Sequence, residues 1–288
     1  MSTAPMTPPA AAAGTFKLGD LTVNRMGFGA MRITGEGIWG EPRNPTEAKA
    51  VLRRAVELGV QLIDTADSYG PDVSERLIGE TLHPYPAGVV IATKGGLVRP
   101  APGAWERDCR PEHLTRALEG SLKRLRVERI DVYQLHTVDP RVPLEESVGT
   151  LARLREQGKI RHVALSNVTV AQLRAARRIV PIVSVQNRYN LTDRSSDDVL
   201  AECEREGLGF MPYFPLAANA LTGSASPLVQ AAKRHGVAPG QLALAWLLHR
   251  SPVMLPIPGT SSVKHLEENV AAAAMKLSAD ELRALERG

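Results

Sequence analysis

The sequence of 288 residues predicts an α/β fold, a (β/α)8 TIM barrel with an N-terminal β-hairpin and extra helices. Short apolar runs typical of buried strands alternate with longer amphipathic segments typical of helices, and eight such pairs follow one another. Eight parallel strands close a barrel. An open doubly wound sheet is the alternative, but the first strand (residues 25–31, RMGFGAM) lacks the GxGxxG pattern of such folds.

Residues 1–24 precede this alternation. Residues 1–14 are small, proline-rich and without periodicity, so we expect a disordered tail. Residues 15–24 (TFKLGDLTVN) alternate around Gly19 and Asp20, which predicts a β-hairpin that we place beneath the barrel floor. Residues 15–288 are then expected to form a single barrel domain.

The elements of the barrel follow in order along the chain. The first helix shows the pattern: apolar residues at Ala48, Val51, Leu52 and Ala55 recur with helical spacing, and Gly59 ends it. The expected strands are residues 25–31, 61–64, 89–94, 130–136, 162–167, 182–190, 208–216 and 253–259. The expected helices are residues 45–58, 74–82, 111–125, 144–159, 169–180, 196–207, 228–235, 241–250, 265–274 and 278–287.

Composition excludes several classes of protein. The formal charge of +4 is spread along the chain without a basic stripe, so we expect no nucleic-acid partner. No run of about 18 apolar residues occurs, so we expect no membrane span. Cys109 and Cys203 lie far apart and in no metal-binding spacing, which favours reduced thiols, a cytoplasmic location and no metal site.

An acid, a phenol, an amine and an imidazole lie at the ends of three successive strands. Asp64 ends the second strand and Tyr69 follows it, while Lys94 and His136 end the next two. Parallel barrel strands would bring all four to one mouth. An ammonium near a phenol lowers its pKa, Asp64 would hold Lys94 charged, and His136 would donate a hydrogen bond to a substrate oxygen. The set suits giving a proton to an oxygen that gains negative charge.

Carbonyl reduction by hydride produces such an oxygen, and the hydride must come from a cofactor because no side chain supplies one. Each residue also has a structural interpretation. Asp64 could cap a loop, Tyr69 could pack at the rim, and His136 could be a hydrogen-bonded core histidine. Their shared position at consecutive strand ends favours catalysis.

Several segments resemble matching segments of the aldo-keto reductases. They are IDTADSYG, SERLIG, ATKGG, LHTVD, ALSNV, VQNRYN, PYFPL and IPGTSSVKHLEENV, in that order, and the resemblance runs from about residue 15 to residue 275. It implies a (β/α)8 barrel that binds NADP(H) without a Rossmann domain and reduces aldehydes or ketones to alcohols. It also implies that Asp64, Tyr69, Lys94 and His136 form the catalytic tetrad, with Tyr69 as the general acid.

The resemblance also implies a cofactor site. Ser166, Asn167 and Gln186 match the positions that hold the nicotinamide carboxamide, and Tyr213 matches the aromatic residue on which the ring stacks; core packing is the alternative for Tyr213. The expected cofactor-binding residues are Ala30, Met31, Asp64, Ser166, Asn167, Gln186, Tyr213, Phe214, Pro215, Leu216, Ile257, Gly259, Thr260, Ser261, Ser262, Lys264, His265, Glu268 and Asn269.

The helix start after the eighth strand is the expected phosphate site. Ser261, Ser262, Lys264 and His265 supply donors there, although they could equally cap the helix. Many family members have lysine where Gly259 stands and arginine where His265 stands. We therefore expect an NADPH preference that is weaker than in arginine-bearing relatives, because histidine carries only a partial charge at neutral pH.

The substrate is less clear from the sequence. Trp39 and Trp105, in the loops after the first and third strands, could hold a planar substrate or pack their own loops. The C-terminal segments resemble the bacterial branch that includes pyridoxal reductases. A nucleotide-sensing regulatory subunit of the same fold is the alternative to an enzyme. The expected partner is a small carbonyl compound, and the expected assembly is a monomer or weak homo-oligomer.

Overall fold

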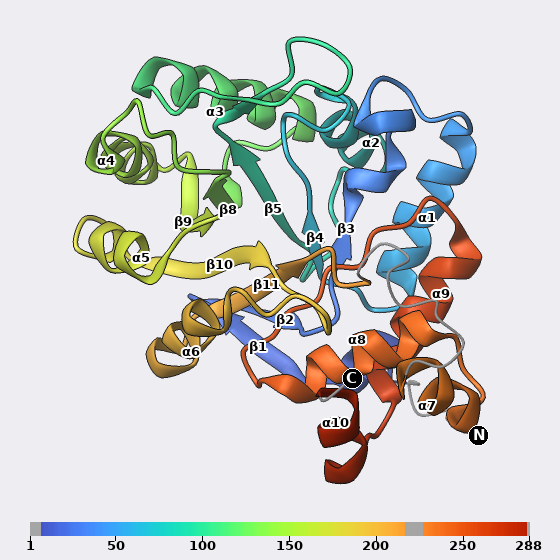
Figure 1. The fold of residues 1–288 in the computed structure, drawn as a ribbon. Coiled ribbons are helices and arrows are strands. Elements are labelled where there is room, and N and C mark those ends of the chain that lie inside the picture. Colours follow the sequence, from blue (N-terminus) through green and yellow to red (C-terminus); the bar gives the residue numbers. More distant parts are fainter. Residues whose placement is uncertain (1–6, 217–226, 287–288) are drawn as a thin grey trace.

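The computed structural model describes residues 7–216 and 227–286, and it confirms the barrel (Figure 1). Seven parallel strands form one curled sheet, and the chain order of the strands is also their order in space. These strands are β3 (Phe28–Gly29), β4 (Leu62–Asp64), β5 (Val90–Gly95), β8 (Ile130–Leu135), β9 (Ile160–Ser166), β10 (Ile182–Arg188) and β11 (Gly209–Tyr213). Their shared direction places all their carboxyl ends on one face.

Residues 253–258 take the place of the eighth strand. On one side, two main-chain hydrogen bonds of 2.8 and 2.9 Å join this segment to Phe210 of β11. On the other side, the amides of Gly27 and Gly29 donate to two of its proline carbonyls, at 2.9 and 3.4 Å. Prolines have no N–H, so the segment cannot form a continuous ladder. The strand expected at residues 253–259 therefore closes the barrel as an irregular segment.

Helices surround the sheet on its outer side (Figure 1). Local sequence explains two of their starts: the Asn44 side chain accepts from the amide of Glu47, and Thr169 and Gln172 form a capping box. The helices are α1 (Pro45–Glu57), α2 (Val73–Leu82), α3 (Pro111–Leu125), α4 (Leu144–Glu156), α5 (Val170–Arg177), α6 (Asp197–Glu206), α7 (Pro227–His235), α8 (Pro239–Arg250), α9 (Val263–Ala271) and α10 (Ala279–Glu286). Each corresponds to a predicted helix.

The predicted hairpin consists of β1 (Thr15–Leu18) and β2 (Leu21–Asn24), which pair antiparallel. Leu18 and Val23 are fully buried and pack with inward-facing residues of the barrel. These barrel residues are Leu62, Val90, Ala92, Val132, Ala164, Val183, Met211, Leu255 and Ile257. The hairpin thus forms the floor of the barrel, as expected, and everything chemical lies above this apolar layer.

Two regions differ from the expectations. The tail expected to be disordered through residue 14 is ordered from Pro9, where a 3-10 helix (Pro9–Ala13) begins; residues 1–6 lie outside the described part of the chain. Ala10 is fully buried and its amide donates to the carbonyl of Leu58 at 2.9 Å, so packing against the end of α1 orders the segment. A small antiparallel pair, β6 (Leu97–Val98) and β7 (Glu106–Arg107), shapes the loop after β5. Among the described helices, none is long and apolar enough to cross a membrane.

Candidate active site

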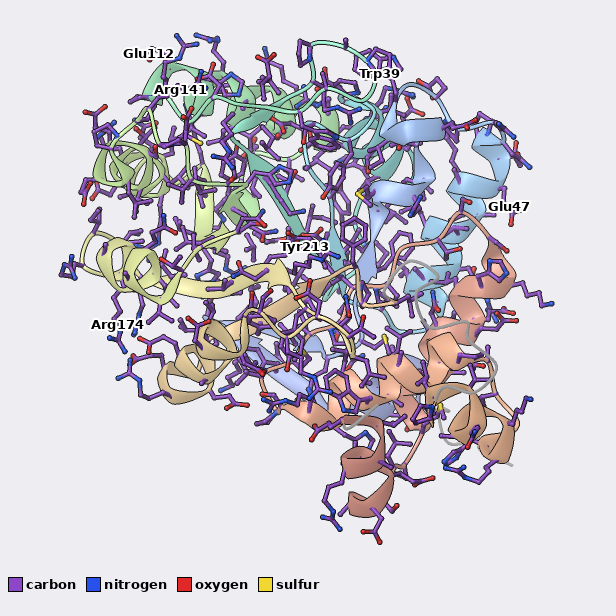
Figure 2. All side chains as sticks on the ribbon, viewed as in Figure 1. Trp39, Glu47, Glu112, Arg141, Arg174 and Tyr213 are labelled. Carbon is purple, nitrogen blue, oxygen red and sulfur yellow. The ribbon has the colours of Figure 1, made fainter. Side chains whose placement is uncertain are left out.

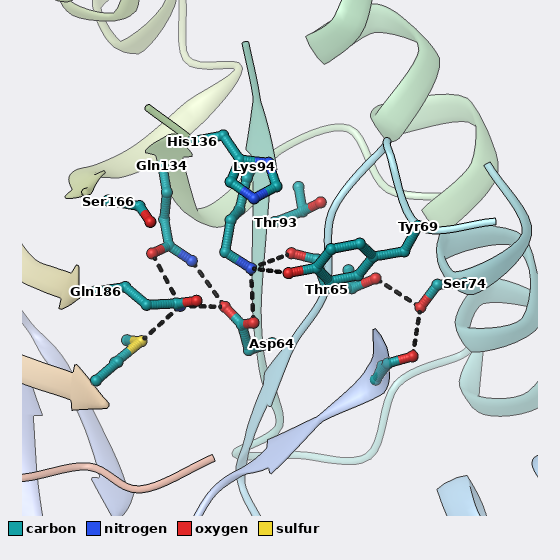
Figure 3. A network of polar contacts seen from close by, with 12 residues as sticks. Asp64, Thr65, Tyr69, Ser74, Thr93, Lys94, Gln134, His136, Ser166 and Gln186 are labelled. Carbon is teal, nitrogen blue, oxygen red and sulfur yellow. Dashed lines mark hydrogen bonds and ion pairs between the residues drawn. The ribbon is translucent and has the colours of Figure 1, made fainter. Parts of the chain in front are cut away.

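Asp64, Tyr69, Lys94 and His136 meet at the carboxyl ends of the strands (Figure 3). The ammonium of Lys94 donates to Asp64 Oδ2 at 2.7 Å, to the carbonyl of Thr65 at 2.8 Å and to the hydroxyl of Tyr69 at 3.3 Å. Lys94 is fully buried and Asp64 is nearly so. A buried ammonium needs such partners, because removing its hydration without replacement is costly.

The second oxygen of Asp64 is also occupied. Gln134 and Gln186 each donate an amide N–H to Asp64 Oδ1, at 2.8 and 2.9 Å. Gln134 was not predicted from the sequence, yet a signal existed. Successive side chains of a strand point to opposite faces, and Gln134 stands two residues after the floor residue Val132, just as Lys94 follows Ala92.

Hydrogen bonds through Ser74 hold the loop that carries Tyr69. Thr65 Oγ1 donates to Ser74 Oγ at 2.7 Å, and Ser74 Oγ donates to the carbonyl of Ala30 at 3.1 Å. The amide of Ser74 donates to the carbonyl of Tyr69, also at 3.1 Å. These bonds tie the loop after β4 to the start of α2 and to the end of β3, so the phenol has a defined position.

Burial and neighbouring charges set the protonation of these groups. Burial raises the pKa of Tyr69 above its ordinary value, and the Lys94 ammonium opposes only part of that rise. As expected, Lys94 lowers the pKa of the Tyr69 phenol. The expectation that this pKa falls overall is wrong, because burial raises it by more. Burial lowers the pKa of Lys94, but Asp64 and Tyr69 outweigh it and the net shift is upward. Burial, with help from Lys94, holds the pKa of His136 well below its ordinary value.

His136 stands edge-on to Tyr69, with ring centroids 5.9 Å apart at an interplanar angle of 83°. The Ser68 hydroxyl lies 3.5 Å from His136 Nδ1. Both rings line one cavity of about 370 Å³, to which Ser166, Asn167 and Trp105 also contribute. Tyr69 and His136, two of the four predicted catalytic residues, thus face a common space.

A second cavity, of about 270 Å³, meets the first at Met31, Tyr69, Gln186, Tyr213 and Phe214. Of the remaining residues expected at the cofactor, Asp64, Pro215, Leu216, Ile257 and Gly259 also line it. Tyr213 lies near the centre of the barrel mouth in Figure 2. Its hydroxyl donates to Asn167 Oδ1 at 2.7 Å, while Asn167 Nδ2 donates to the carbonyl of His136 at 3.0 Å. Ala30, by contrast, is fully buried and does not line this cavity.

Arg32 also lines this second cavity and was missed from the sequence. It is exposed, and within the described chain it forms no ion pair. A Cβ at Gly259 would lie 3.5 Å from Arg32 Cγ and 2.7 Å from the carbonyl of Gly29. Gly259 therefore packs too closely on the backbone of Gly29 to carry a side chain without a shift, and the unpaired Arg32 lies beside it. The missing lysine at Gly259 was a signal that another cation could serve there.

The expected phosphate site at the start of α9 has a feature that the sequence did not reveal. Glu47 of α1 accepts from the amide of Val263 at 3.1 Å, so a carboxylate lies at this helix N-terminus (Glu47, Figure 2). Ser261, Lys264 and His265 are exposed here. The other expected residues of this stretch are less exposed: Ser262 and Glu268 are half-buried, and Thr260 and Asn269 are buried.

The two tryptophans do not flank an open slot. The Arg99 guanidinium lies 3.9 Å from the ring centroid of Trp105 and 5.5 Å from that of Trp39. Arg99 also donates to the carbonyls of Gly37, Ile38 and Ala104, at 3.2, 2.9 and 2.8 Å. Trp105 lines the cavity of Tyr69 and His136, whereas Trp39 lies at the barrel's edge (Figure 2) and is absent from the described lining. The expected pairing of the tryptophans around a substrate is thus replaced by pairing around Arg99.

Comparisons with known proteins agree with this architecture. The model of the aldo/keto reductase family matches residues 25–287. The chain is 50% identical over 271 residues to an uncharacterized oxidoreductase of Schizosaccharomyces pombe, covering 94% of this chain and 88% of that protein. It is 42% identical over 278 residues to pyridoxine 4-dehydrogenase of Escherichia coli, covering 94% and 97%.

A solved structure gives the same result for the fold. An aldo-keto reductase from Klebsiella pneumoniae, in complex with NADPH, matches with a TM-score of 0.79 at 30% identity, covering 92% of this chain and 91% of that chain. The family match spans nearly all of the barrel, including Asp64, Tyr69, Lys94 and His136. The chain therefore belongs to the aldo/keto reductase family.

Proposed function

We propose that the protein is an NADP(H)-dependent oxidoreductase that reduces aldehydes or ketones to alcohols, with Tyr69 as the general acid. The observation that carries this proposal is the buried series from Asp64 through Lys94 to the Tyr69 hydroxyl, which ends at the two adjoining cavities. Family membership and the NADPH-bound relative support the choice of cofactor.

The two adjoining cavities together fit such a cofactor. Gln186 uses its N–H group toward Asp64 and Gln134, which leaves its amide oxygen free to accept from a carboxamide. The Tyr213 ring borders both cavities and offers a face for a nicotinamide. The Arg32 guanidinium in the lining of the second cavity suits a phosphate group. When bound, NADPH supplies the hydride.

The side chains divide the proton chemistry among them. Because its pKa is raised, Tyr69 holds its proton at neutral pH and donates it to the carbonyl oxygen as that oxygen becomes negative. The Lys94 ammonium stabilises the phenolate that remains, and Asp64 keeps Lys94 charged and in place. His136 is neutral. A hydroxyl that donates to its Nδ1 leaves the proton on Nε2, which would orient the substrate oxygen.

A carbonyl-substrate screen tests this function. Purified protein is mixed with NADPH and a panel of aldehydes that includes 4-nitrobenzaldehyde, and the nicotinamide absorbance is followed. We expect oxidation of NADPH with at least the aromatic aldehydes. Tight NADPH binding without turnover on any aldehyde would contradict the enzyme and support the alternative, a nucleotide-sensing regulatory subunit.

We further propose a planar aromatic aldehyde, pyridoxal, as a substrate. The similarity to pyridoxine 4-dehydrogenase supports it, and so does the apolar lining of the cavity by Ile38 and by the flat rings of Trp105 and Phe214. Competitive assays should show pyridoxal reduced more efficiently than an aliphatic aldehyde of similar size. The reverse ranking would contradict this substrate class.

We also propose that the barrel acts as one domain, as a monomer or weak homo-oligomer in the cytoplasm. The ordered segment from Pro9 belongs to that domain, because Ala10 is buried against it. The buried free thiols of Cys109 and Cys203 support a reducing location. Sedimentation at several protein concentrations would measure the assembly directly.

A further inference from the structure

A third cavity, of about 590 Å³, adjoins the one that holds Tyr69 and His136. Leu97, Trp105 and Asn167 line both, so the two spaces share a wall. This outer cavity lies between the β6–β7 pair and the loops after β8 and β9. A substrate whose carbonyl lies at Tyr69 could therefore extend outward past Trp105 into it.

Arg107 brings a positive charge to the outer cavity. It ends β7, is exposed and, within the described chain, pairs with no carboxylate. The neighbouring cations differ: Arg110 pairs with Asp108 at 2.7 Å and Arg141 pairs with Asp139 at 2.9 Å. Arg107 is thus the guanidinium of this loop that remains available to an anion from outside.

The rest of the lining favours the same kind of ligand. Gln172 accepts from the amide and hydroxyl of Thr169 through Oε1, which leaves its N–H groups free. Thr137 adds a hydroxyl, while Leu97, Val138 and Pro140 are apolar. The described lining contains no carboxylate. Donors gathered without an acidic group suit a carboxylate or phosphate, which guanidinium binds bidentately.

We propose that this outer cavity is an anion subsite, in which Arg107 binds an acidic group that the carbonyl substrate carries away from its reacting end. The proposal rests on the proposed carbonyl reduction and adds to it a class of substrate: aromatic aldehydes that bear a carboxylate or phosphate. Trp105 lies between the reacting carbonyl and the acidic group of such a substrate, because Trp105 borders both cavities.

Two matched aldehydes test the subsite. The probes are 4-carboxybenzaldehyde and its methyl ester, which differ in charge and share the ring and the aldehyde. We expect a higher kcat/KM for the acid in the wild-type protein. In Arg107→Gln the acid-to-ester ratio should fall about 10- to 100-fold, the range for losing a hydrogen bond to a charged group. Arg107→Lys should keep part of the preference.

Arg116→Gln is the control, because Arg116 is an exposed arginine of α3 outside the lining of this cavity. It should leave the acid-to-ester ratio unchanged. A ratio that Arg107→Gln does not alter, or that Arg116→Gln lowers equally, would overturn the subsite while leaving the reductase intact. If neither aldehyde turns over, the proposed function fails, and calorimetry with 4-(hydroxymethyl)benzoate then tests the subsite alone. Equal binding to wild type and Arg107→Gln would overturn it.

Discussion

The polar centre of the active site, around Asp64, and the rim of the site are held together in opposite ways. At the polar centre, Asp64 has both oxygens occupied, by Lys94 on one side and by Gln134 and Gln186 on the other. At the rim, the Arg99 guanidinium joins two loops through three main-chain carbonyls and two indole rings, with no acid. Side-chain identity therefore determines the polar centre, whereas the rim depends on loop backbones that many sequences could supply.

The largest expected effect lies at Tyr69, beside the polar centre of the site. Tyr69→Phe removes the proposed proton donor and leaves the ring in place, so kcat should fall by about 10²- to 10⁴-fold, the usual contribution of general acid catalysis. The dissociation constant for NADPH, measured by fluorescence titration, should change little. Wild-type turnover of an ordinary aldehyde by this variant would show that Tyr69 is not the acid.

Lys94→Met should come next, with a loss in kcat of about 10²-fold. Lys94 opposes the effect of burial on Tyr69, so its removal raises the phenol's pKa further and makes it a weaker acid. The alkaline limb of the kcat profile should therefore move to higher pH, since the phenol keeps its proton longer. The measurement is kcat from neutral pH upward, and a limb at unchanged pH would contradict the coupling.

The same variant leaves the Asp64 carboxylate buried without its cation. Breaking a buried ion pair costs about 3–5 kcal/mol of the free energy of unfolding. The double variant Asp64→Asn, Lys94→Met removes both charges, so denaturant unfolding should show most of that loss recovered. Activity should stay low in the double variant. Recovery of activity together with stability would assign this pair a purely structural role.

The rim should respond through binding. Arg99→Met deletes the contacts that hold residues 37 and 38 to the loop after β5, so both loops gain freedom. We expect KM for an aromatic aldehyde to rise about tenfold with little change in kcat, because ordering the loops then draws on substrate binding energy. Arg43→Met is the control, since Arg43 lies in the same region in an exposed pair with Glu36. An equal rise in both variants would remove any special role of Arg99.

This contrast also explains what the sequence could predict. The meeting of Asp64, Lys94 and His136 was predictable because strand ends and two-residue spacing place these three residues on one face of the barrel. Gln134 follows the same rule and could have been found. The contacts of Arg99 with the carbonyls of Ile38 and Gly37 could not, because these carbonyls are 61 and 62 residues away in the chain and no residue pattern encodes a main-chain carbonyl.

The start of α9 shows a similar limit and gives the smallest expected effect. Glu47 and Val263 are 216 residues apart and meet only because α1 packs on α9. If the cofactor's ribose phosphate binds at this helix start, the Glu47 carboxylate opposes it, and the nearby Lys264 ammonium lies 4.0 Å from the Glu268 carboxylate. The preference for NADPH over NADH should then be modest.

Glu47→Gln keeps an oxygen that can accept from Val263 while removing the charge. A charge at a helix end is worth about 0.3–1 kcal/mol, so the NADPH-to-NADH ratio of kcat/KM should rise about two- to fivefold. His265→Arg should raise it further, because arginine gives a permanent bidentate clamp. Glu267→Gln is the matched control, since Glu267 lies on α9, beyond its first turn, and pairs with Arg54 at 2.7 Å. A ratio that neither Glu47→Gln nor His265→Arg changes would place the phosphate elsewhere, and the unpaired Arg32 would then be the next residue to substitute.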